Sequence, residues 1–180
     1  MAWRNSADGF GLITRLLHWG MALLILAQLA LGLRLVTMQP GLANLWLYGL
    51  HKTLGFLVLA LLVLRVLWHG LSPVPGPLGP AGVAATAARL VHRLIYALLV
   101  AIPLSGWAGS SATGIDVMIA DRWVVPPLVE PSEVSEAFWF GWHWYLALVL
   151  AGLVALHVAG ALKRALSGDG TLRRMIRGRV

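Results

Sequence analysis

The sequence predicts an all-α integral membrane protein, a four-helix bundle, on two observations. First, 59% of the 180 residues are hydrophobic and only 12% are charged, whereas soluble domains are about 45–50% apolar and about 25% charged. A soluble domain of ~150 residues still leaves about 30% of its chain surface in water, so this apolar excess cannot be hidden in a core. Second, the charged residues are widely spaced and leave long uncharged segments. We therefore expect lipid to surround much of the surface of a single domain over residues 1–180.

Four transmembrane helices are expected from these segments. Uncharged runs occupy residues 16–33, 94–115 and 137–162, and each suits the ~20 apolar residues that cross a bilayer core. The second helix must carry Lys52 and Arg65 near its ends, where long charged side chains can reach the membrane surface. A cleaved signal peptide is the alternative for the first helix, although that segment lacks a compact basic leader and a cleavage site. The expected helices span residues 11–35, 46–69, 87–109 and 136–165.

The distribution of lysine and arginine predicts that both termini are cytoplasmic. Eleven of these residues fall on the side of the termini and the 70–86 connection, and three fall on the opposite side. The cytoplasmic loops of membrane proteins carry this excess. Five of the seven acidic residues lie in the long outer loop between the third and fourth helices. This topology explains the net charge of +7 more simply than nucleic-acid binding does, so no nucleic-acid partner is expected.

The histidines form a pattern. Five lie inside the expected helices, where an ionisable side chain is costly and suggests function, and His69 lies at a helix end. His143 and His157 are 14 residues apart, so at ~100° and 1.5 Å per residue they face nearly one direction with ~21 Å between them. His18 lies at the depth of His157, and His51 lies at the depth of His143. Because a bundle brings such side chains together in its interior, the sequence predicts two bis-imidazole sites.

Noncovalent b-type heme fits such sites best. The absence of cysteine excludes iron–sulfur clusters, thiolate zinc sites and covalent c-type heme. Two imidazoles without a nearby carboxylate are too few for zinc or non-heme iron, whereas heme leaves two axial positions to the protein. Two other interpretations remain: histidines that are hydrogen-bonded within the bundle, and a metal or small-solute transporter. His92 is a third candidate for the inner heme, a proton-handling group beside a quinone, or an interfacial residue, and we assign no role to His69.

These residues resemble the bacterial cytochrome b561 family, four-helix di-heme membrane cytochromes that include superoxide oxidase. The resemblance covers essentially the whole chain. The matching segments are Arg15-Leu-Leu-His-Trp19, His51-Lys-Thr-Leu-Gly55, His92 with Tyr96, Trp142-His143, Leu156-His157 and Asp169-Gly-Thr-Leu-Arg-Arg-Met175.

The resemblance implies two heme b groups in the bacterial inner membrane. The axial ligands to iron would be His18 with His157 and His51 with His143, in agreement with the depth argument. Quinone, with ubiquinone as the expected acceptor, would be one redox partner.

The resemblance leaves the electron donor open. Superoxide at the periplasmic face would make the protein a superoxide:quinone oxidoreductase, with Lys52 and Arg122 attracting the anion, although the outer loop is net acidic. The alternative is an electron-transfer subunit that docks to a dehydrogenase or a soluble cytochrome and has no substrate chemistry of its own. Lys52, His92 and Arg93 are the candidate catalytic residues. Arg15, Arg89 and Arg93 are candidates to meet the inner heme propionates or a quinone, or they simply reach the inner membrane surface.

Overall fold

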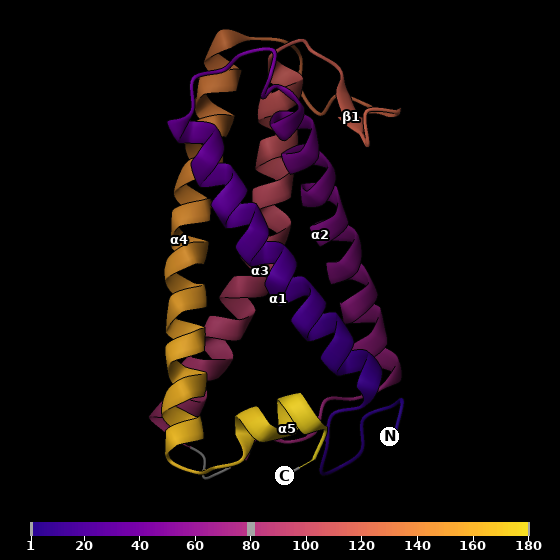
Figure 1. Ribbon diagram of the computed structural model, residues 1–180, viewed down its shortest axis with the longest axis vertical. Coiled ribbons are helices and arrows are strands. Elements are labelled where there is room, and N and C mark those ends of the chain that lie inside the picture. The colour runs from indigo at the N-terminus through magenta and orange to yellow at the C-terminus, as the bar shows by residue number, and fades with distance from the viewer. Residues whose placement is uncertain (1, 79–81, 180) are drawn as a thin grey trace. The chain divides into compact units, whose positions relative to one another are not determined.

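The computed structural model describes residues 2–78 and 82–179, and the described chain is mostly helical (Figure 1). The elements in chain order are α1 (Leu12–Thr37), α2 (Trp46–Leu71), α3 (Val83–Ala112), β1 (Val117–Ile119), β2 (Trp123–Val125), α4 (Glu133–Leu166) and α5 (Thr171–Arg177).

The four long helices confirm the four predicted membrane spans. Each is long and apolar enough to cross a membrane, and at most 11% of the residues in the apolar stretch of any one of them are buried inside the protein. The observed ends lie within four residues of the expected ones, and α3 and α4 each begin earlier than expected. Large apolar side chains such as Leu23 and Leu67 are exposed, as a surface solvated by lipid requires.

The chain contacts divide into two compact units, and each unit contains a segment of all four long helices. Unit 1 comprises Met1–Ala22, Leu61–Tyr96 and Gly152–Val180, and unit 2 comprises Leu23–Ala60 and Ala97–Ala151. The single domain expected over residues 1–180 stays a prediction.

Unit 1 is held largely by polar contacts. Thr14, with 1% of its surface exposed, accepts a hydrogen bond of 2.9 Å from the Trp68 indole. In this unit α5 lies beside the N-terminal end of α1 (Figure 1). There Trp19 donates to the Met175 carbonyl at 3.2 Å, and Arg15 donates to the Ile176 carbonyl. The short helix α5, which the sequence pattern did not predict, is thereby fixed to α1.

The proline-rich connection between α2 and α3 takes its hydrogen bonds from distant parts of unit 1. Proline has no backbone N–H and cannot continue a helix, and residues 73–78 are indeed non-helical. The Asn5 side chain donates to the Ser72 carbonyl at 2.9 Å. Arg164 donates to the Leu78 carbonyl, and Arg174 donates to the Gly76 carbonyl at 2.8 Å. Residues 79–81 of the connection lie outside the described residues.

Unit 2 has the larger apolar core among the described residues. The buried apolar side chains of this unit are Ile25, Met38, Val58, Leu99, Ala108, Ala112, Val117 and Leu150. The helix α4 begins at Glu133 because Ser132 caps it: the Ser132 side chain accepts a hydrogen bond from the Ser135 N–H.

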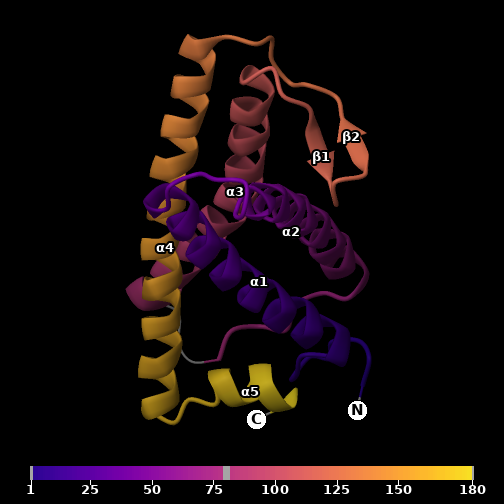
Figure 2. The same ribbon diagram turned by 45° about the horizontal axis from the view of Figure 1, so that its top comes forward.

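The outer loop of unit 2 contains a short antiparallel hairpin of β1 and β2 that was not predicted (Figure 2). Its turn residues Ala120 and Asp121 both have positive φ, of 52° and 51°. The hairpin is tied to α2, because the Ala120 N–H donates to the Thr53 hydroxyl at 2.9 Å. The following segment is tied to α3, where the Trp107 indole donates to the Pro126 carbonyl at 3.0 Å.

Candidate functional site

Unit 1 brings together three of the six histidines. The ring centres of His18 on α1 and His157 on α4 are 6.2 Å apart, with an angle of 69° between the ring planes. The ring centres of His92 on α3 and His157 are 5.0 Å apart. His92 Nε2 is 3.2 Å from His157 Nδ1, so these two nitrogens share a hydrogen bond. The predicted pair of His18 and His157 is therefore adjacent, and His92 contacts it.

A cation completes this cluster. Arg65 on α2 places Nη1 and Nη2 each 3.3 Å from His18 Nδ1. Its guanidinium carbon is 5.7 Å from the centre of the Tyr96 ring, within the range of a cation–π contact. The inner cluster, defined here as His18, Arg65, His92 and His157, thus takes one residue from each long helix.

Unit 2 brings together the other predicted pair. The ring centres of His51 on α2 and His143 on α4 are 6.0 Å apart, with 82° between the ring planes. His143 Nδ1 lies 2.9 Å from the Ile102 carbonyl, which can only accept, so Nδ1 carries the hydrogen and Nε2 is left with a lone pair. A histidine that binds a metal commonly has its other nitrogen held in this way.

Glycines face both rings of this outer pair. A Cβ built on Gly106 of α3 would lie 2.9 Å from His143 Cε1 and Nδ1, and one built on Gly32 of α1 would lie 3.4 Å from His51 Cε1. On α1, Gln28 donates to the His51 backbone carbonyl at 3.0 Å. The His51 Nδ1 atom is buried and has no hydrogen-bond partner among the described residues. At Gly106 and Gly32 the two rings therefore face a glycine rather than a larger side chain.

The two pairs fit the axial positions of a heme. A metal–imidazole bond is about 2.0 Å long and a ring centre lies about 1 Å beyond its nitrogen, so two axial rings have centres roughly 6 Å apart. The separations of 6.2 and 6.0 Å agree with this spacing. Within residues 2–78 and 82–179, no three or more His, Cys, Asp or Glu side chains form a group suited to a metal ion. Two imidazoles per site therefore suit a cofactor that supplies its own equatorial ligands.

Comparison with known proteins identifies the family. Residues 9–178 match the family described as prokaryotic cytochrome b561. The chain belongs to the prokaryotic cytochrome b561 family. Cytochrome b561 homolog 2 of Escherichia coli (strain K12) is 34% identical over 181 residues, which cover 98% of this chain and 95% of the relative. A protein of Yersinia pestis named probable superoxide oxidase CybB is 25% identical over 167 residues, covering 89% of this chain and 91% of the relative.

Membership of the cytochrome b561 family fixes the general role of the chain. The protein is a multi-pass electron-transfer protein of the bacterial inner membrane, and its family binds b-type heme. The expected fold class and family are thereby confirmed.

Four other residues singled out from the sequence belong to neither imidazole pair. Lys52 is half-buried and Arg93 is exposed, and neither makes a side-chain hydrogen bond or ion pair with the described residues. Arg122 is exposed and stacks on Trp123, with 5.4 Å from the guanidinium carbon to the ring centre. His69 is half-buried near the end of α2 and is not part of either pair.

The remaining arginine candidates bind protein groups outside the imidazole pairs. Arg15 is 8% exposed and donates to the carbonyl of Ile176. Arg89 donates to the Thr86 hydroxyl at 2.9 Å on an exposed face of α3. The structure therefore gives both arginines a protein partner of their own.

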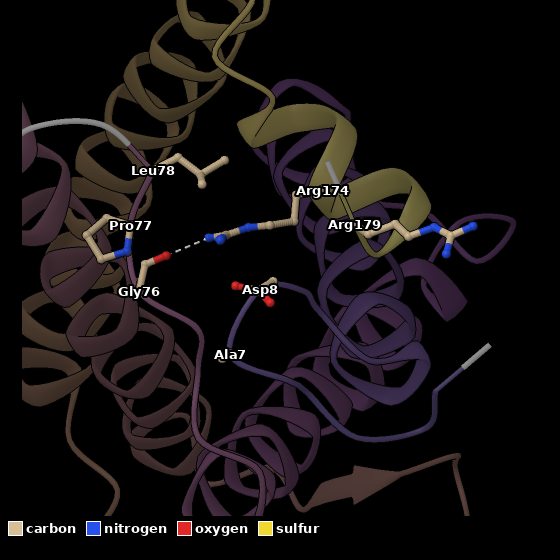
Figure 3. Close-up of a pocket in the computed structure, with 7 residues that line it drawn as sticks. All are labelled: Ala7, Asp8, Gly76, Pro77, Leu78, Arg174 and Arg179. Carbon is tan, nitrogen blue, oxygen red and sulfur yellow. Dashed lines mark hydrogen bonds between the residues drawn. The ribbon is translucent and has the colours of Figure 1, made fainter.

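A cavity of about 450 Å³ in unit 1 lies outside the histidine clusters (Figure 3). Arg174 extends across it to the Gly76 carbonyl, and Asp8 lies nearby. Burial lowers the pKa of Arg174, and the nearby Arg164 lowers it further, whereas Asp8 acts in the opposite direction. Because Arg174 is 4% exposed and is already bonded to the backbone and stacked on Phe10, this cavity is part of the framework around the connection.

Sequence reasoning missed Arg65, which it counted only as a charge at a helix end. A usable signal was present, because Arg65 follows His51 at the same separation as that between His143 and His157. The same interval separates His18 from Gly32 and His92 from Gly106. Each long helix therefore contributes one residue to the inner cluster. On nearly the same face, at this interval along the helix, it contributes either a histidine of the outer pair or a glycine that faces one.

Proposed function

We propose that this cytochrome b561 holds two b-type hemes and transfers electrons between a periplasmic donor and the quinone pool. His18 and His157 would be the axial ligands in unit 1, and His51 and His143 those in unit 2. The observation that carries the proposal is the separation of the ring centres, 6.2 and 6.0 Å. It is the spacing that two imidazoles on one iron require.

The protein's own residues prepare these imidazoles to bind iron. Each heme, when bound, supplies a one-electron Fe(III)/Fe(II) couple. The Ile102 carbonyl holds the hydrogen of His143 on Nδ1 and keeps the Nε2 lone pair available. His92 Nε2 can accept the Nδ1 hydrogen of His157 in the same way, across 3.2 Å. His92 is thus proposed as a positioning residue for His157, and the exposed cation of Arg93, the next residue, is proposed to lie beside the quinone.

The ligand assignment is tested by counting hemes after single substitutions. The purified protein should show reduced b-type absorption bands and about two hemes per chain. Replacement of His18, His51, His143 or His157 by alanine should each remove one heme. His69→Ala is the matched control and should keep both. His92→Ala should also keep both, because a heme has only two axial positions.

Two outcomes would overturn this assignment. If no pair-member substitution removes heme, other residues bind the iron. A protein without a Soret band would instead favour the transporter interpretation of the histidines.

Superoxide is the proposed donor, and two observations support it. The relative from Yersinia pestis is named a probable superoxide oxidase. In unit 2 the Ala120 N–H donates to the Thr53 hydroxyl. This bond joins the turn that contains Asp121 and Arg122 to the part of α2 that contains Lys52. Two cations on adjoining segments favour the approach of an anion, and the Asp121 carboxylate in this turn acts against it. The balanced reaction is the oxidation of two superoxide ions to two O₂, with one quinone and two protons giving one quinol.

Stopped-flow mixing with superoxide tests the donor. Wild-type protein should be reduced by superoxide and should then reduce ubiquinone. Lys52→Gln and Arg122→Gln should each slow the first step about two- to tenfold, and the effect should shrink as salt rises. Arg34→Gln removes another cation of unit 2 and should change the rate little.

A different donor would give a different pattern. A protein that does not react with superoxide, but is reduced by a copurifying dehydrogenase or soluble cytochrome, is an electron-transfer subunit without substrate chemistry. Reduction by superoxide that is insensitive to both substitutions would retain the donor and refute the two cations as its attractants.

Both termini are proposed to be cytoplasmic, which makes the outer pair periplasmic. The natural chain has no cysteine, so single cysteines can report the topology without background. A membrane-impermeant maleimide applied to intact spheroplasts should label Glu130→Cys, in the exposed outer loop, and should not label Ser167→Cys, after α4. The reverse labelling would invert the orientation.

A further inference from the structure

Arg65 is a half-buried cation in the membrane-spanning part of α2 that has no carboxylate partner among residues 2–78 and 82–179. Its Nε atom is buried without a hydrogen-bond partner in the described chain, and its two terminal nitrogens contact His18 Nδ1. Among the described residues, the ion pair in unit 1 joins Arg164 to Asp169 and does not involve Arg65. A charge in this position is costly unless it is compensated.

The contact between Arg65 and His18 cannot persist when His18 binds iron through Nε2. A guanidinium only donates hydrogen bonds, so His18 Nδ1 must accept the contact at 3.3 Å. A neutral imidazole whose Nε2 lone pair binds a metal carries its hydrogen on Nδ1, and that nitrogen can no longer accept. Arg65 must then find another acceptor close to the same ring.

The position of Arg65 in the sequence points to the same site. Its distance along α2 from His51 equals the distance along α4 between His143 and His157. Three helices contribute a histidine to the inner cluster and α2 contributes this arginine, whereas in unit 2 two helices contribute histidines and two contribute glycines. Of the four helix positions at each site, a cation therefore occupies one at the inner cluster and none at the outer pair.

We propose that Arg65 binds a carboxylate of the heme held at the inner cluster, and this rests on the proposed heme site between His18 and His157. A b-type heme carries propionate carboxylates, and a guanidinium matches a carboxylate with two parallel hydrogen bonds. The carboxylate would supply the counter-charge that Arg65 lacks, and the move of Arg65 to this carboxylate would free His18 Nδ1 to carry its hydrogen. Its positive charge also disfavours the ferric state, so it raises the reduction potential of the inner heme.

The test compares protoheme with its dimethyl ester, which lacks free carboxylates, in wild-type protein and in Arg65→Gln. Wild type should retain protoheme at the inner site roughly tenfold better than the ester, a typical effect of losing a charged hydrogen bond. Arg65→Gln should lose this preference. The difference between the ester effect in wild type and in Arg65→Gln measures the interaction of Arg65 with the carboxylate. Any effect of esterification at the outer site is the same in both proteins and cancels.

Redox titration gives a second readout. In Arg65→Gln the oxidised-to-reduced ratio of one heme at fixed potential should rise about tenfold, which is about 59 mV for one electron. Arg65→Lys keeps the positive charge but cannot make the two parallel hydrogen bonds of a guanidinium. Compared with Arg65→Gln, it should restore most of the midpoint potential but less of the preference for protoheme over its ester. Arg173→Gln removes an exposed cation of unit 1 and should change neither measurement.

The outcomes separate this inference from the proposed heme site. If wild type carries an inner heme that His18→Ala removes, and Arg65→Gln keeps the full preference for protoheme, the carboxylate partner is refuted while the ligands stand. If wild type binds no heme that depends on His18, the heme site itself fails. A midpoint potential unchanged in Arg65→Gln would place the cation away from the iron and would also count against the proposal.

Discussion

Replacement of Gly106 by alanine should selectively damage the outer histidine pair. Gly106 lies on α3 in direct contact with the His143 ring, and a Cβ there would be 2.9 Å from Cε1 and Nδ1. Ordinary van der Waals contacts begin at 3.4 Å, so the ring must move by several tenths of an ångström. The same Nδ1 atom is held by the Ile102 carbonyl at 2.9 Å, so a movement of the ring away from the new Cβ would also disturb this hydrogen bond.

The expected cost follows from these contacts. An off-rotamer ring costs about 0.5–1.5 kcal/mol, and a weakened hydrogen bond costs about 0.5–1.5 kcal/mol. Together they predict a loss of roughly 1–3 kcal/mol in heme affinity at this site, or about a 5- to 150-fold weaker binding constant. The other heme, at the inner cluster of unit 1, should be retained.

Gly141→Ala is the matched control for this experiment. Gly141 lies on α4 in the same unit, and nothing lies within 4 Å of a Cβ built on it. Both variants gain helix propensity, by about 1 kcal/mol, so a difference between them reports the contact with His143. Heme dissociation measured by transfer to apomyoglobin, together with hemes per chain, provides the assay. If Gly106→Ala retains both hemes as firmly as Gly141→Ala does, the ring is not confined as the structure indicates.

Two further predictions concern segments outside the long helices. Burial acts to raise the pKa of Asp169, but hydrogen bonds from Thr171 and the Arg164 guanidinium outweigh it and lower the pKa. The Asp169 carboxylate therefore stabilises the folded protein fully above pH 3.8, its ordinary pKa, and this stabilisation is lost as the pH falls below that value. Asp169→Asn should thus lower the free energy of unfolding at pH 7 by less than about 1 kcal/mol, which would lower the melting temperature slightly. Below pH 4 the melting temperatures of the variant and of the wild type should converge. A gap that persists in acid would contradict this. In the hairpin turn, Ala120 has φ of 52°, a conformation that asparagine tolerates and valine does not. Ala120→Asn should therefore stabilise the protein by about 0.5–1 kcal/mol, and Ala120→Val should destabilise it. Thermal unfolding measures both changes, and melting temperatures that shift in the same direction would refute strain at this turn.

The sequence allows the long helices to be predicted well because charge is excluded from lipid. The ends of α1 lie three residues beyond Arg15 and Arg34, and those of α2 lie six residues beyond Lys52 and Arg65. The charged residues therefore place the helix ends to within about two turns, since an arginine is costly in the hydrocarbon core. The hairpin was missed because strands of three residues show no periodicity and its turn is Ala120-Asp121 rather than the usual Asn-Gly. The helix α5 was missed because it has seven residues and begins after Gly170 without a capping side chain.

The histidine pairs were predictable because depth along a straight helix is given by residue number. His18 and His157 each lie near the inner end of an uncharged run, and the structure brings them together. Hydrogen-bond partners were less accessible, because they depend on how the helices are rotated. Neither the carbonyl of Ile102 at His143 nor the contact of His92 with His157 can be read from spacing alone. Arg65 could have been found, had the interval between the two α4 histidines been applied to α2.

The way the proline-rich connection is held has a consequence for synthesis of the protein. The donors to the Leu78 and Gly76 carbonyls are Arg164 and Arg174, which lie 86 and 98 residues further along the chain. At about 5–20 residues per second, the connection is synthesised roughly 5–20 s before these partners are. During that interval α1 and α2 can insert, but the loop behind them has only Asn5 as a donor to its backbone carbonyls among these contacts. A nascent chain released before residue 164 should therefore be cut by protease between residues 72 and 78, whereas the complete chain should resist cleavage there.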